Sequence, residues 1–140
     1  MRKGFVFLCA TLLLSCQTQE ISIPSMKYTY DAIDSLLISW KGLFDVKDAH
    51  YYALIFSKSC HHCLAIEEAV VRYALSESVP EMYFIQATPY IPKGKDISST
   101  LGATTVDEIF ILGWPTLLEI EEDTLIGHLA GEKAILKKLT

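Results

Sequence analysis

The stretch that decides the fold runs from residue 50 to residue 74 and reads HYYALIFSKSCHHCLAIEEAVVRYA. Its beginning, His50 to Phe56, is a nearly continuous apolar run with aromatic side chains, which is typical of a strand buried on both faces of a parallel sheet. From Cys63 to Ala74 the apolar residues recur at helical spacing. The sequence therefore predicts that a pair of cysteines, Cys60 and Cys63, joins a buried strand to a helix.

The start of a helix is a place where a cysteine can become reactive. Unpaired backbone N–H groups and the positive end of the helix dipole favour an anion there. The thiolate is the nucleophile in disulfide exchange, so we expect this position to activate Cys60. Cys63 follows one helical turn later, on the same side and within reach of Cys60. A Cys-x-x-Cys pair in a β-α-β pattern favours a redox-active dithiol.

The rest of the chain predicts one α/β domain with a central mixed sheet flanked by helices. Strands are expected where short apolar or aromatic runs occur, and helices where apolar residues recur every three or four positions. The predicted order is β-α-β-α-β-α-β-β-α. Outside the opening stretch, we expect strands at 26–30, 81–87, 116–120 and 125–129, and helices within 31–44, within 98–110 and at 132–139.

A second motif lies about fifty residues after the cysteines. Gly113-Trp114-Pro115-Thr116 places a proline directly before a predicted strand, and a hairpin, a glycine and a last helix follow. Together with the Cys-x-x-Cys pair, this pattern makes residues 26–140 resemble the thioredoxin family. The resemblance implies a thioredoxin-like fold in which the Trp114–Pro115 bond is cis and packs against the dithiol. It also implies that Trp114, Pro115 and Thr116 form the substrate-binding side of the site.

The chain departs from the thioredoxin pattern at several places. Leu54 stands where thioredoxins proper have a buried acid, Ser59 where an aromatic is frequent, and His61-His62 where they have Gly-Pro. We therefore do not expect a general thioredoxin reductant. Oxidising members of the family resemble this chain in having a histidine immediately before the second cysteine. We expect His61 and His62 to tune the stability of the Cys60 thiolate, and with it the redox potential.

Two other uses of the cysteine pair stay open. Two thiolates and an imidazole could bind zinc or copper, although a structural zinc site needs a second pair of ligands at a recognisable spacing. His50 and His128 are predicted to be ordinary strand residues. The alternative to redox turnover is therefore a thioredoxin-like lipoprotein that binds copper, zinc or a partner protein.

The N-terminus looks like an export signal. Arg2 and Lys3 precede an apolar run, Phe5 to Leu14, which is shorter than the roughly 20 residues of a transmembrane helix. The run ends in Leu-Leu-Ser-Cys, which resembles the lipidation site of bacterial lipoproteins, with Cys16 as the lipidated residue. We expect a signal peptide at 1–15, a tether at 16–25 and the domain at 26–140. This places the domain outside the cytoplasm on the bacterial cell membrane, where disulfides persist.

Composition limits the remaining possibilities. The 140 residues are 51% hydrophobic and 21% charged, which suits one globular domain. The formal net charge is -5 and no basic block alternates with aromatics, so we do not expect nucleic-acid binding. The prediction is a monomeric thiol-disulfide oxidoreductase that exchanges disulfides with protein substrates and needs no cofactor beyond the Cys60–Cys63 disulfide. A separate, unidentified redox partner would recycle it.

Overall fold

The computed structural model describes residues 27–140. The predictions for the signal peptide, for Cys16 and for the tether lie outside the described residues, as does Met26 at the start of the first predicted strand. The named elements are β1 (His50–Phe56), α1 (His61–Leu75), β2 (Glu81–Gln86), β3 (Thr116–Glu121), β4 (Thr124–Ala130) and α2 (Glu132–Leu139).

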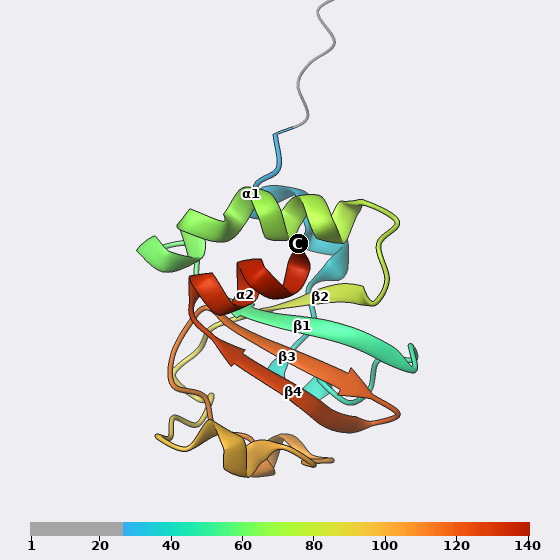
Figure 1. Cartoon of the computed structure of the whole chain (residues 1–140), viewed down its shortest axis with the longest axis vertical. Coiled ribbons are helices and arrows are strands. Elements are labelled where there is room, and N and C mark those ends of the chain that lie inside the picture. Colours follow the sequence, from blue (N-terminus) through green and yellow to red (C-terminus); the bar gives the residue numbers. More distant parts are fainter. Residues whose placement is uncertain (1–26) are drawn as a thin grey trace, which may run out of the picture.

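The strands form one mixed sheet in the order β2-β1-β3-β4. β1 runs parallel to β2 and antiparallel to β3, and β3 and β4 form an antiparallel hairpin. Both helices lie on the same side of this sheet, α1 above α2 in the view of Figure 1. The predicted fold class, an α/β fold with a mixed sheet and helices, is confirmed. A β-α-β unit followed by a hairpin and a helix is the arrangement that the resemblance to thioredoxins implied.

Each face of the sheet carries its own hydrophobic core. Along β1 the side chains alternate, so that Tyr52, Leu54 and Phe56 pack toward the helices. Tyr51, Ala53 and Ile55 pack on the other face, against the segment between β2 and β3 and against Leu43. All six side chains are at most 5% exposed, as the sequence predicted for a strand buried on both faces. This burial fixes the end of β1, and therefore the residues that follow it.

The first predicted strand and helix are wrong. The described part of the strand makes no regular pairing, and short 3-10 helices occupy Tyr30–Ala32, Asp34–Leu36 and Trp40–Gly42. Between them the chain extends at Leu37, which pairs with Phe84 of β2, and the N–H of Ile38 donates to the carbonyl of Phe84 at 2.9 Å. Hydrogen bonds to the sheet edge thus replace the helical bonds that the local spacing predicted.

The helix predicted within 98–110 is wrong too. Two 3-10 helices, Ile97–Thr100 and Val106–Glu108, are separated by Gly102, which has φ +89°. A left-handed residue ends a helix, and glycine adopts that conformation at little cost. The loop then pairs with β4, since Gly102 N–H donates to the carbonyl of Leu125 at 2.8 Å. Residues 27–140 therefore form four strands and two α-helices in the order β-α-β-β-β-α.

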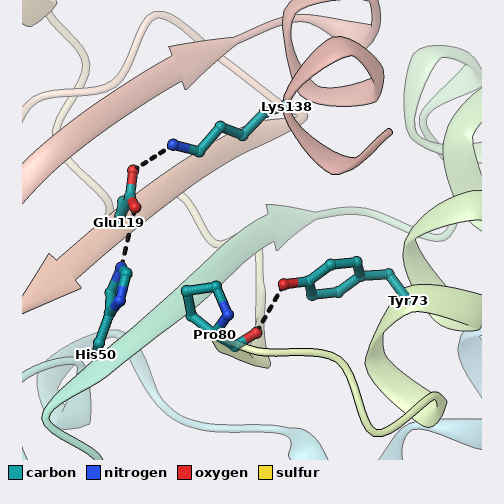
Figure 2. Close-up of polar contacts among 5 residues, drawn as sticks. All are labelled: His50, Tyr73, Pro80, Glu119 and Lys138. Carbon is teal, nitrogen blue, oxygen red and sulfur yellow. Dashed lines mark hydrogen bonds and ion pairs between the residues drawn. The ribbon is translucent and has the colours of Figure 1, made fainter.

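The end of the sheet opposite the cysteines is held by polar contacts, which Figure 2 shows. Glu119 of β3 accepts a hydrogen bond from Lys138 in the last turn of α2 at 2.9 Å and lies 3.0 Å from Nε2 of His50. Nearby, the hydroxyl of Tyr73 donates to the carbonyl of Pro80 at 2.9 Å. These contacts tie both helices to the end of the sheet that is remote from the candidate site.

Candidate active site at Cys60 and Cys63

Cys60 is the N-cap of α1. The helix begins at His61, two residues earlier than the periodicity of the sequence predicts, so both histidines lie in its first turn. Cys60 has extended backbone angles, and its Sγ accepts a hydrogen bond from the backbone N–H of Cys63 at 3.4 Å. Thiol groups rarely serve as caps, but a thiolate suits an exposed N–H at a helix start. The geometry therefore places the half-exposed sulfur where a negative charge is stabilised.

The second motif meets the first at this sulfur. The Trp114–Pro115 bond is cis, as the resemblance implied. The carbonyl of Trp114 lies 3.6 Å from the Sγ of Cys60, and the thiol donates to it. Residues 54 positions apart in the sequence thus form one site between the start of α1 and the start of β3.

Cys63 has the opposite environment. Its side chain is fully buried and belongs to the core beneath the helices, together with Leu54. The N–H of Ser57 donates to its Sγ at 3.4 Å. Burial raises the pKa of Cys63 to about 12, although the Ser57 N–H acts against this and the neighbouring Cys60 adds to it. Cys63 is therefore a protonated thiol behind an accessible one, and both are free thiols in the structure.

His61 and His62 are exposed in the first turn of α1. Their rings are 5.8 Å apart between centroids. His62 Nδ1 lies 3.7 Å from a carboxylate oxygen of Glu132 at the start of α2, an ion pair when the imidazole is protonated. His62 thus faces the neighbouring helix start, and its influence on the thiolate of Cys60 stays a prediction.

A shallow groove of about 430 Å³ lies beside the dithiol. Trp114 both lines this groove and contacts the Sγ of Cys60 through its carbonyl, so the groove adjoins the accessible sulfur. Thr116 is not among the residues that line the groove: its side chain is buried, and its hydroxyl donates to the carbonyl of Gly113 at 2.6 Å. The groove is lined by His62, Trp114, Pro115, Ala130, Gly131, Glu132, Lys133 and Ala134.

Two residues near the site have no signal in the sequence. The hydroxyl of Tyr30 donates to the carbonyl of Cys63 at 2.8 Å from 33 positions away. The ammonium group of Lys93 lies 4.3 Å from the centre of the Trp114 ring, a cation–π contact. Neither contact follows from local periodicity or motif spacing, because each joins segments that only the folded chain brings together.

The structure shows no cluster of metal ligands among the described residues. Within residues 27–140, no three side chains of histidine, cysteine, aspartate or glutamate gather around a point that could hold a metal ion. His50 contacts Glu119 at the opposite end of β1, and His128 is buried on β4 with its Nδ1 against the hydroxyl of Thr100 at 2.8 Å. Both histidines are the strand residues that the sequence predicted.

Comparisons with known proteins find thioredoxins among the solved structures. The oxidised form of mitochondrial thioredoxin 3 from Saccharomyces cerevisiae has a TM-score of 0.48 at 15% identity, over 79% of this chain and 95% of that chain. The long form of thioredoxin f from spinach chloroplast has a TM-score of 0.48 at 14% identity, over 78% of this chain and 90% of that chain. No family model and no curated protein sequence matches the chain.

Proposed function

We propose that the chain is a thiol-disulfide oxidoreductase that exchanges disulfides with protein substrates through Cys60 and Cys63. One observation carries the proposal. The half-exposed Sγ of Cys60 caps α1 and meets the Cys63 N–H at 3.4 Å and the Trp114 carbonyl at 3.6 Å, while Cys63 is buried behind it. A two-step exchange requires an accessible thiol that attacks the substrate and a second, shielded thiol that resolves the mixed disulfide.

In the reducing direction, the Cys60 thiolate attacks one sulfur of a substrate disulfide. The substrate S–S bond breaks, the first substrate thiolate leaves and takes up a proton, and a mixed disulfide joins Cys60 to the second substrate sulfur. Cys63 then loses its proton and attacks the Sγ of Cys60, which releases the second substrate thiolate. Two electrons have moved from the dithiol to the substrate. In the oxidising direction the same steps run backwards, with Cys63 as the first leaving group.

Substrate would bind in the groove beside Cys60. Trp114 and Pro115 give it an apolar wall, and an extended peptide could pair with the backbone next to Trp114 by strand addition. Thr116 would act indirectly, because its hydroxyl bonds to the carbonyl of Gly113, the residue before Trp114. The redox group is the cysteine pair itself, and the proposed function includes no further cofactor. His61 and His62 would adjust the stability of the thiolate, because they are the side chains in the first turn next to it.

We place this activity outside the cytoplasm, on a membrane to which lipid on Cys16 attaches the chain. The support is the sequence of residues 1–16, a short basic start and an apolar run that ends in Leu-Leu-Ser-Cys. Within residues 27–140, the helices are too short or too polar to cross a bilayer. Replacement of Cys16 by serine should abolish partition of the mature protein into detergent. If the precursor stays uncleaved, it keeps its apolar run and is not informative on this point; a cleaved Cys16→Ser protein that still partitions like the wild type would refute the anchor.

Trapping of the mixed disulfide tests the activity itself. Cys63→Ser cannot resolve, so after exposure to oxidised glutathione it should hold one glutathione at Cys60, detectable by mass spectrometry. Cys60→Ser is the matched control and should hold none on the pair, because the thiol of Cys63 is buried. Wild type should pass through the adduct to an internal disulfide. Equal adduct formation in both variants, or none in Cys63→Ser, would refute the proposed function.

A further inference from the structure

Tyr30 lies beneath the dithiol. Its ring is 1% exposed and stacks on the ring of Phe56, with 4.3 Å between centroids and 28° between planes. Phe56 is the last residue of β1, four positions before Cys60. The tyrosine therefore packs against the end of the strand that leads into the cysteine pair.

The polar atoms of Tyr30 reach the helix that carries the pair. Its hydroxyl donates to the carbonyl of Cys63 at 2.8 Å, and this contact is buried. Its backbone N–H donates to a carboxylate oxygen of Glu67 at 2.8 Å. One residue thus contacts the last residue of β1 and makes hydrogen bonds to the first two turns of α1.

The hydroxyl acts on the peptide group between Cys63 and Leu64. The carbonyl of this group accepts from Tyr30, and its N–H, that of Leu64, donates to the carbonyl of Cys60 at 3.0 Å. A peptide group is planar, so a bond that orients its carbonyl orients its N–H as well. The hydroxyl of Tyr30 is therefore connected to the backbone of Cys60 through one rigid unit.

From this geometry we infer that Tyr30 is a positioning residue of the dithiol. Its hydroxyl holds the first turn of α1 in the form in which the Cys63 N–H faces the Sγ of Cys60 and stabilises the thiolate. The inference rests on the proposed function, since it assigns Tyr30 to the same reaction. The phenol stays protonated while the dithiol reacts, because burial and then the charges of Cys63, Glu67 and Cys60 raise the pKa of Tyr30.

Tyr30→Phe removes the hydroxyl and keeps the ring on Phe56, so the variant is expected to fold. The matched control is Tyr73→Phe, which also removes a hydroxyl that donates to a backbone carbonyl, at the other end of α1 (Figure 2). The measurement is the rate of Cys60 alkylation by iodoacetamide against pH. In Tyr30→Phe the rate near neutral pH should fall about two- to tenfold, the range expected for one lost hydrogen bond, and the profile should move to higher pH. Tyr73→Phe should follow the wild type.

The possible outcomes separate the inference from the proposed function. An unchanged alkylation profile in Tyr30→Phe, or the same change in Tyr73→Phe, would overturn the role of Tyr30. A Tyr30→Phe chain that does not fold would also overturn it, because the hydroxyl would then support the fold rather than the dithiol. A Cys63→Ser variant that holds no glutathione after exposure to oxidised glutathione would defeat the proposed function. Exchange by the wild type with an unaffected Tyr30→Phe would defeat the inference alone.

Discussion

Limiting alkylation of the folded dithiol should label Cys60 and leave Cys63 unmodified. The pKa of Cys63 is raised to about 12, first by burial, so at pH 7 about 10⁻⁵ of its molecules are thiolate. An ordinary thiol with a pKa of about 8.5 is about 3% thiolate at the same pH. The thiolate is the reacting form, so Cys63 should react about 10³ times more slowly than an ordinary thiol, before its lack of exposure is counted.

The assay is mass spectrometry of peptides after a short pulse of substoichiometric iodoacetamide at pH 7. We expect the label on Cys60 alone in the folded protein. In concentrated urea both cysteines should take the label at similar rates, because unfolding removes the burial that separates them. Between pH 7 and 9 the labelling rate of Cys63 should rise about tenfold per unit of pH, since its thiolate fraction does. Comparable labelling of the two cysteines in the folded protein would refute the assignment of nucleophilic and resolving thiols.

The other predictions concern stability, measured as the free energy of unfolding in urea. Burial acts to raise the pKa of Glu119, but its hydrogen bonds to Lys138 and His50 lower the pKa overall. The ionised carboxylate therefore stabilises the fold at pH values above its ordinary pKa, and this stabilisation is lost as the pH falls and the carboxylate takes up a proton. Glu119→Gln should cost about 1 kcal/mol at pH 7 and less toward pH 3, and a constant difference would contradict this. Gly127→Ala should cost about 1 to 3 kcal/mol, because its Cβ would lie 2.9 Å from the Cβ of Glu119, an atom that the backbone of β3 holds in place. The control Gly113→Ala meets nothing within 4 Å, and an equal loss there would contradict the steric cause. Burial lowers the pKa of His128, so the unfolded chain binds more protons and stability should fall as pH drops below about 6.5. His128→Leu should reduce this dependence of the free energy of unfolding on pH. An unchanged dependence in the variant would show that another group causes it.

The centre of the fold was predictable because its signals are local. The apolar run of β1 is buried on both faces, and the periodicity after Cys63 continues through α1. The residues between them follow from these two elements, so the position of Cys60 at a helix start was predictable as well. The meeting of Trp114 with Cys60 depended on the resemblance to thioredoxins, because no periodic pattern relates segments 54 residues apart.

The failures occur where a distant strand competes with a local pattern. The apolar residues before β1 do recur at helical spacing, but the extended backbone at Leu37 pairs with Phe84, 47 positions later, and the N–H of Ile38 donates to the carbonyl of Phe84. Within 98–110 the apolar spacing was likewise overridden, by a left-handed glycine and by pairing with Leu125 of β4. The contact of Tyr30 with Cys63 was also missed. The local pattern predicted a strand at this segment, whereas the folded chain forms a short 3-10 helix there that packs against α1.

One structural feature separates the roles of the two thiols. A helix that starts directly after Cys60 leaves this residue outside the first turn, where its sulfur meets a free N–H and the groove. The same helix carries Cys63 one turn further, on the side that faces the core, so its thiol is desolvated. Formation of a mixed disulfide removes the thiol of Cys60 and with it the smaller cause of the raised pKa of Cys63, but burial, the largest cause, remains. In the proposed exchange, Cys63 would therefore have to lose its proton against this burial before it resolves the mixed disulfide. Cys63→Ser removes that thiol but keeps the backbone N–H that faces Cys60, so the trap should report the first step.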